Sequence, residues 1–245
     1  MANLLDEVTG PVNTAGRDVN VIDKQIPVTV GIGSTIFEIC LWVVPIVVAV
    51  LIPWLLGKSW FIAAAGIVPG LIWLYIKQKA HNYLQQLEQK MQGAASQIDN
   101  YLEQRRQVIL NLMPQLQAAI NLDKDVMKSV AALRSGIPQG EDLNSRSAQI
   151  NTVAAHLFPQ LEAYPELRSH EQIAYAMQQN DYLQREITAA RTVYNNVIAQ
   201  WNRDIFDWPA KQIVAAKQKY STRIPYSIST EKKQEAQSNL FANLK

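Results

Sequence analysis

The chain has few of the residues from which most catalytic and metal sites are built. Its 245 residues include one cysteine, so neither an internal disulfide nor a site of several thiolates can form. Gly31-Ile32-Gly33-Ser34 lacks the lysine and the context of a phosphate-binding loop. No histidine has a second ligand at metal-site spacing on a common helix; the three are His81, His156 and His170. We therefore expect no catalytic, cofactor or metal site, and no enzyme.

Strong charge and a leader sequence are also absent. The formal net charge is only +2, which does not favour nucleic acid as a partner. The first 38 residues lack a basic start followed by an early apolar core, so we expect no cleavable signal peptide. A hydrophobic segment further along the chain must then direct the protein to its compartment.

Two apolar stretches, residues 39–56 and 59–76, supply that segment. Each has eighteen uncharged residues, and Gly57-Lys58-Ser59 separates them. A single helix over both would be about 57 Å long, roughly twice the hydrocarbon thickness of a bilayer, and would bury Lys58. We therefore predict a transmembrane hairpin. Two alternatives stay open: a hairpin buried in a globular core, and a stretch that only dips into the bilayer, since three prolines interrupt the spans.

Four tryptophans and two glycines fit this hairpin. Tryptophan prefers the headgroup level of a bilayer, and the expected interface anchors are Trp42, Trp54, Trp60 and Trp73. Gly66 and Gly70 have the spacing that lets two membrane helices approach closely, within one chain or between chains. Lysines and arginines flank the outer ends of both spans. This bias places both ends of the chain in the cytoplasm and predicts a multi-pass protein of the bacterial inner membrane.

The rest of the sequence has helical periodicity. A long helix is expected from Lys77 to Ile120, continuing from the second span, with Pro114 bending it rather than ending it. A capping box at Ser169 begins another long helix that reaches Ile205 with alternating four- and three-residue apolar spacing. Shorter helices are expected at 123–133, 144–157 and 210–220. No β pattern extends beyond residues 28–30.

These patterns predict an all-α protein in which a transmembrane helical hairpin precedes an elongated antiparallel helical bundle. The expected segments are a polar amino-terminal segment (1–35), the membrane hairpin (36–78), the bundle (79–220) and a polar carboxy-terminal tail (221–245).

Several polar residues lie where apolar ones would pack better. Asn180, Gln184 and Arg191 occupy positions on the apolar face of the last long helix. Because a desolvated polar group must be paired, we predict hydrogen bonds between the two long helices, or to a second copy. The alternative is a solvated face. The candidate residues on these helices are Asp99, Arg105, Arg106, Glu186, Arg191, Tyr194 and Asn195.

The chain resembles the LemA family from about His81 to Tyr226. The shared residues include Gln97-Ile98-Asp99, Arg105-Arg106, Tyr194-Asn195 and Ala163-Tyr164-Pro165-Glu166-Leu167, which adds Tyr164 and Pro165 to the candidates. The resemblance implies a bacterial membrane-anchored helical bundle without established catalytic activity, linked in some lineages to membrane remodelling. Most relatives have one span near the start, whereas two are expected here.

The sequence thus leads to the hypothesis of a non-catalytic scaffold at the cytoplasmic face of a bacterial inner membrane. Its expected partners are the lipid bilayer and further copies of the chain, with no cofactor and no nucleic acid. The alternative is an accessory subunit that regulates another membrane protein, such as a membrane protease.

Overall fold

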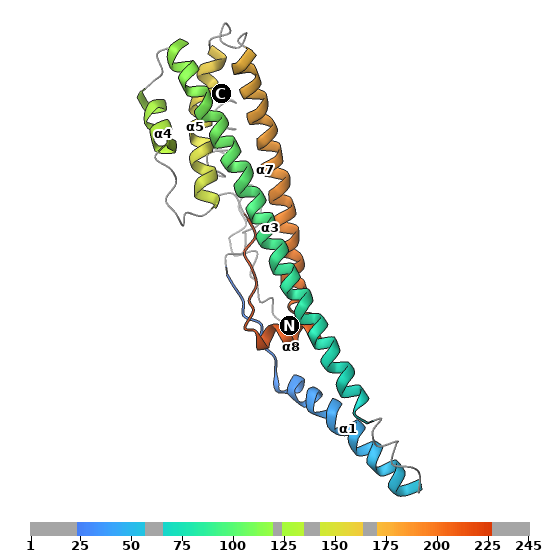
Figure 1. The fold of residues 1–245 in the computed structure, drawn as a ribbon. Coiled ribbons are helices and arrows are strands. Elements are labelled where there is room, and N and C mark those ends of the chain that lie inside the picture. The colour runs from blue at the N-terminus through green and yellow to red at the C-terminus, as the bar shows by residue number, and fades with distance from the viewer. Residues whose placement is uncertain (1–23, 57–65, 120–123, 135–142, 164–170, 227–245) are drawn as a thin grey trace, which may run out of the picture. The chain divides into compact units, whose positions relative to one another are not determined.

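The structure, a computed structural model, describes residues 24–56, 66–119, 124–134, 143–163 and 171–226 (Figure 1). The fold is all-α, as predicted. Within the described ranges the only β pairing is an isolated bridge between Pro27 and Ser221. The helices are α1 (Ile32–Leu56), α3 (Val68–Ala119), α4 (Lys124–Arg134), α5 (Leu143–Ala163), α7 (Glu171–Asp204) and α8 (Ala210–Lys217).

The long helices follow the apolar periodicity closely. Helix α3 runs from an apolar start into the amphipathic region without a break, and Pro114 lies inside it. The expectation that this proline would not end the helix is confirmed. Pro114 removes one backbone donor, and the residues around it, Met113 and Leu116, keep the helix packed through their fully buried side chains.

The second apolar stretch differs from the prediction. Gly66 and Ile67 form a turn, and α3 begins at Val68, so residues 59–76 are not one continuous helix. Pro69 explains the position of the boundary. In the first turn of a helix the backbone N–H groups have no acceptor within the helix, so proline, which lacks an N–H, loses no hydrogen bond there. The predicted turn at residues 57–59 lies outside the described residues.

Contacts divide the chain into two compact units. Unit 1 comprises residues 1–91 and 196–225, and unit 2 comprises residues 92–195 and 226–245. Helices α3 and α7 each contribute residues to both units. This division does not coincide with the segment boundaries expected from composition.

Unit 2 is built around one apolar core. Helices α3, α4, α5 and α7 contribute buried side chains to it, including Ile98 and Met113 from α3, Leu157 from α5 and Ile187 from α7. Helices α3 and α7 are antiparallel, because Arg105 contacts Asn180 whereas Gln115, later in α3, contacts Gln172, earlier in α7. The predicted antiparallel pairing of these helices is thus present.

Unit 1 has its own core around Trp201, which is fully buried. The indole packs edge-on against Tyr220 with ring centroids 5.0 Å apart and donates a hydrogen bond to the carbonyl of Ser221 at 3.0 Å. Helix α8 adds the buried Ile213 and Val214. The segment after α8 therefore packs on an indole that comes from the final turn of α7.

The residues after α8 reverse direction through a Schellman motif. Lys219 adopts a left-handed backbone with φ 56°, its N–H bonds to the carbonyl of Ala216, and the N–H of Tyr220 bonds to that of Ala215. The extended chain that follows, residues 220–226, is termed the strap. Its Thr222 exchanges hydrogen bonds of 2.8 and 2.9 Å with the backbone of Ile26, just before α1.

Two asparagines of α7 bind the backbone of the strap. Asn202 accepts from the N–H of Arg223 at 2.7 Å and donates to its carbonyl at 2.9 Å. Asn195 makes the same pair of bonds with Tyr226, at 2.7 and 3.0 Å. Seven residues of helix rise about 10.5 Å, and three residues of extended chain span about 10 Å, so the two spacings match. Each side-chain amide thus makes the two backbone hydrogen bonds that a neighbouring β-strand would otherwise make with that strap residue.

Candidate functional site

Helix α1 has the properties of a membrane-spanning helix. Its residues Ile32–Leu51 have a mean hydropathy of 2.3, and only 6% of them are buried. Within the described ranges no other helix is long and apolar enough to cross a membrane. The low burial argues against the alternative of a helix buried in a globular core. From Glu38 to Leu56 the helix rises about 27 Å, close to the hydrocarbon thickness of a bilayer.

A polar and aromatic cluster marks one end of this apolar stretch. Glu38 of α1 forms an ion pair with Lys77 of α3, and the indole N–H of Trp73 donates to the same carboxylate at 3.3 Å. Phe37 packs between two indoles, those of Trp73 (5.5 Å) and Trp208 (5.1 Å). The start of α1, the start of α3 and the corner before α8 therefore meet at one level of unit 1.

The four tryptophans predicted as interface anchors differ in their surroundings. Trp54 is 80% exposed, as expected for an anchor. Trp73 is only 5% exposed, because its ring packs on Phe37 and its N–H bonds to the Glu38 carboxylate, so it differs from Trp54 in being covered by the protein. Trp42 is half-buried against α3, and Trp60 lies outside the described residues.

The two glycines predicted for helix packing lie against α1. A Cβ at Gly66 would come within 2.6 Å of the Ala49 side chain and 2.8 Å of the Pro45 carbonyl. A Cβ at Gly70 would meet the ring of Trp42 at 2.5 Å. Both positions thus allow α1 to approach the start of α3 within the same chain.

A buried polar layer lies inside unit 2, between α3, α5 and α7. Arg105 is 5% exposed, and its guanidinium donates to Asn180 of α7 at 2.8 Å and to Asn151 of α5 at 2.6 Å. Arg191 of α7 donates to Ser147 of α5 at 2.6 Å and to the Tyr226 hydroxyl at 2.9 Å. Burial, followed by the charge of Arg191, lowers the pKa of Arg105 to about 10, against the opposing effect of Asp181.

This layer is the arrangement foreseen for polar residues on an apolar helix face. It joins both long helices, as predicted, and also α5, which the sequence did not indicate. Neither arginine forms an ion pair with a described residue, so neutral oxygen atoms hold both guanidinium groups. The Nε of Arg191 and the Oε1 of Gln184 are buried and have no hydrogen-bond partner among the described residues. Polar contacts of this kind favour one register of the helices over its neighbours.

The remaining candidates lie around the layer. Asp99 forms an ion pair with Arg146 of α5. Arg106 pairs with Glu103 at 2.7 Å and donates to the carbonyl of Leu133 at the end of α4. Tyr194 packs against the apolar core, and Glu186 is half-buried on α7. Tyr164 and Pro165 lie outside the described residues.

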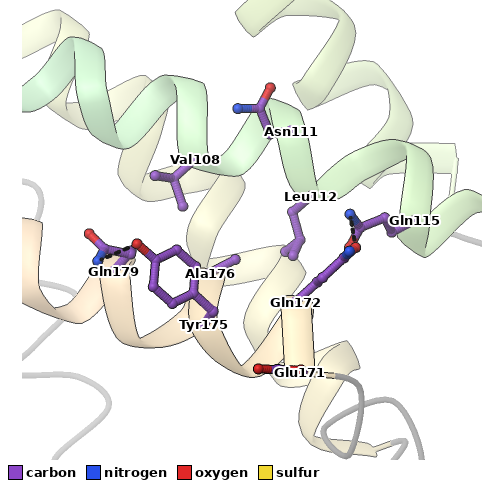
Figure 2. A pocket seen from close by; sticks show the side chains of 9 residues that line it. All are labelled: Val108, Asn111, Leu112, Gln115, Glu171, Gln172, Tyr175, Ala176 and Gln179. Carbon is purple, nitrogen blue, oxygen red and sulfur yellow. Dashed lines mark hydrogen bonds between the residues drawn. The ribbon is translucent and has the colours of Figure 1, made fainter.

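A groove of about 520 Å³ lies on unit 2 between α3 and α7 (Figure 2). Its floor is apolar, with Val108 and Leu112 facing Ala176 and the ring of Tyr175. Glutamines form its edges: Gln115 and Gln172 are hydrogen-bonded across it at 2.7 Å, and Gln179 donates to the Tyr175 hydroxyl at 3.1 Å. Glu171 is the one charged residue that lines it.

Sequence reasoning missed the strap and the groove. The seven-residue spacing of Asn195 and Asn202, before an extended Ile224-Pro225-Tyr226, is a signal for the strap that can be read in the sequence. The groove has no such signal, because its glutamines look like an ordinary solvated helix face. The described residues hold no group of three His, Cys, Asp or Glu side chains that could bind a metal ion.

Residues 94–239, well over half of the chain, match the model of the LemA family. The match overlaps most of the region in which the sequence resemblance was found, and it suggests a membrane-associated helical protein. No curated protein matches the sequence.

Proposed function

The chain belongs to the LemA family, and from this premise we propose that it is a membrane-anchored, non-catalytic scaffold that self-associates at the cytoplasmic face of a bacterial inner membrane. Helix α1 is the anchor. The observation that supports anchoring best is the exposure of its apolar residues, since the mean hydropathy of Ile32–Leu51 is 2.3 and 6% of the segment is buried.

The groove between α3 and α7 supports self-association. An apolar floor with hydrogen-bonding edges that are uncharged apart from Glu171 is suited to another helix, because glutamine and tyrosine both donate and accept. On α7 the exposed Tyr175, Tyr182 and Val193 continue from the groove at spacings of seven and eleven residues, along one face of the helix. Copies anchored in one bilayer share a plane and an orientation, which favours contacts between identical surfaces.

A photo-cross-linking amino acid at position 175 tests this proposal in cells that produce the full chain. Exposed Thr152 on α5 provides the matched control position. We expect an adduct of twice the chain mass from position 175 and little from position 152. No adduct at position 175, or equal adducts at both positions, would contradict self-association through the groove. An adduct with one different protein would favour the accessory-subunit alternative.

A further inference from the structure

Unit 1 carries an excess of positive charge that its own carboxylates do not neutralise. Its described residues contain nine lysines and arginines but four aspartates and glutamates. All four acidic side chains are in ion pairs: Glu38 with Lys77, Glu88 with Arg223, Asp204 with Arg203 and Lys211, and Asp207 with Lys211. Five lysines form no ion pair with a described residue: Lys24, Lys79, Lys90, Lys217 and Lys219.

Three of these lysines lie near the end of the apolar stretch of α1. Lys217, at the end of α8, is close enough for its charge to act on the Glu38 carboxylate. Lys219 follows two residues later, in the turn that leads to the strap. Lys79 is two residues beyond Lys77, the partner of Glu38, which is about 3 Å along α3. All three are exposed.

The fold brings α8 to this level through specific contacts. Trp208, just before α8, is 54% exposed and packs on Phe37 of α1, and the strap after α8 is bonded to the residues that precede α1. Figure 1 shows α8 beside the first turns of α1. Lys217 and Lys219, more than 160 residues after the end of α1 in the sequence, are thereby brought to the level of its first turns.

We propose that Lys79, Lys217 and Lys219 form a surface that binds the anionic headgroups of the lipid bilayer in which α1 is anchored. A bilayer surface is a plane, so lysines at one level of unit 1 reach it without sharing one face of a helix. Each lysine near an anionic leaflet contributes about 1 kcal/mol, which is roughly fivefold in binding. Trp208 at the same level has the amphipathic ring that is enriched at membrane interfaces.

This inference rests on the proposed placement of α1 in the bilayer. Lys90 provides a control that separates a contact of specific lysines with the headgroups from a general effect of positive charge. Lys90 is also exposed and unpaired, but it lies thirteen residues beyond Lys77 on α3, about 20 Å away. That distance exceeds the Debye length of about 8 Å at physiological ionic strength. A lysine at position 90 therefore contributes charge to unit 1 without reaching the headgroups.

The test uses the full chain reconstituted in phosphatidylcholine bilayers with spin-labelled lipids. The motionally restricted fraction of a phosphatidylglycerol probe is compared with that of a phosphatidylcholine probe. We expect a preference for phosphatidylglycerol that is weakened by high salt. In the variant Lys79→Gln/Lys217→Gln/Lys219→Gln the preference should fall by up to about fivefold for each lysine removed, and Lys90→Gln should retain it.

A triple variant that keeps the preference, or Lys90→Gln losing as much, would overturn the inference. So would equal restriction of both probes by the unmodified chain, which would leave the anchor proposal intact. If neither probe is restricted, no lipid contacts the protein, and the proposed placement of α1 fails together with this inference. Among the described residues these exposed lysines form no ion pair or side-chain hydrogen bond that glutamine would remove, and an unchanged circular dichroism spectrum verifies the fold.

Discussion

The two units of this chain solve the same problem, the docking of segments distant in sequence, in opposite ways. Unit 2 packs four helices around an apolar core and inserts a buried layer of neutral hydrogen-bonding groups around two arginines. Unit 1 relies on an extended strap, ion pairs and aromatic contacts, and five of its described lysines form no ion pair with a described residue.

The two units also differ in net charge and in where their charged side chains lie. The described part of unit 2 is almost neutral, with eight basic and seven acidic residues, and the side chains of its polar layer point inward, where they favour one helix register. Unit 1 contains α1 and has its unneutralised charge on exposed lysines, for which we propose that anionic headgroups of a membrane supply the counter-charge. The unit with the apolar helix α1 is thus also the unit with the basic surface.

The largest expected effect comes from removal of the indole that holds unit 1 together. Trp201→Ala should destabilise the protein by about 3–5 kcal/mol, because it leaves a cavity and removes the bond to Ser221. Hydrogen exchange measured by mass spectrometry should show lost protection in residues 210–225 and retained protection in the α5 peptides of unit 2. Equal loss in both units would show that the two are one cooperative structure. Trp208→Ala, at a half-exposed ring, is the matched control.

The buried polar layer of unit 2 can be broken and then replaced. Arg105→Met should cost about 2–3 kcal/mol, since it leaves the amide oxygens of the buried Asn180 and the partly buried Asn151 without their donor. The triple variant Arg105→Met/Asn151→Leu/Asn180→Leu should recover most of this loss in chemical denaturation. If the triple variant is as unstable as the single one, the layer contributes stability beyond the pairing of its own polar groups.

The two asparagines of α7 can be removed one at a time. Asn202→Ala and Asn195→Ala should each cost about 1–2 kcal/mol, because each removes two hydrogen bonds between α7 and the strap backbone. Amide exchange resolved by residue should show that Asn202→Ala exposes Arg223 and Asn195→Ala exposes Tyr226. Exposure of both residues by either variant would mean that the strap detaches as one piece.

Acid titration tests the contribution of Asp204, a buried carboxylate of unit 1, to the stability of the protein. Burial opposes ionisation of Asp204, but the hydrogen bonds from Tyr83 and Arg203 and the charges of Lys211 and Arg203 outweigh it and lower its pKa. Asp204 therefore contributes stability above its unfolded pKa, and that contribution is lost as the pH falls through the lower folded pKa. Tyr83→Phe removes one donor, so acid unfolding of unit 1 should begin at a higher pH. An unchanged acid midpoint would contradict the role of Tyr83.

At alkaline pH, stability depends on the ionisation of Tyr83, and it falls as the pH rises. Burial, followed by the hydrogen bond to Asp204, raises the pKa of Tyr83 above its ordinary value. Its contribution to stability is present below the unfolded pKa, near 10, and is lost as the pH rises through the folded pKa. Asp204→Asn should reduce this loss. Absorbance of the tyrosinate in the variant and the parent protein measures the shift directly.

The smallest expected effect is an increase in the free energy of unfolding. Lys219 occupies the left-handed position of the Schellman motif, which glycine adopts without the penalty of a Cβ, so Lys219→Gly should stabilise the protein by about 1 kcal/mol. Thermal unfolding measures it. Lys217→Gly, at the last helical residue, should destabilise instead, since glycine is a poor helix former. A loss of stability at position 219 would mean that its side chain has a structural contact.

The sequence predicted the helices well because their apolar spacing is regular over long segments. The end of α3 and the bounds of α7 follow from that spacing, and the involvement of Asn180 and Arg191 follows from polar residues on an apolar face. Their partners on α5, Ser147 and Asn151, could not be predicted, because small polar residues on a helix have no pattern that identifies what they contact.

Other features depend on contacts that no local pattern encodes. Trp73 looks like an interface anchor in sequence, yet a single carboxylate on a different helix makes it a buried ring. Gly66-Ile67 interrupts the second apolar stretch because proline and close approach to α1 decide where a helix can begin, whereas hydropathy does not. The strap and the position of α8 result from backbone bonds between segments at opposite ends of the chain.

The depth of α1 in a bilayer is the most direct test of its role as an anchor. Spin labels are placed at Cys40, the only cysteine, and at Val47→Cys in a Cys40→Ser background, with Thr152→Cys on α5 as the aqueous reference. Seven residues separate the two α1 sites, about 10.5 Å along the helix. The ratio of oxygen to nickel-chelate collisions should be lowest at position 152 and rise from position 40 to position 47. The same low ratio at all three positions would show that α1 lies in water, and the proposed membrane anchor would be wrong.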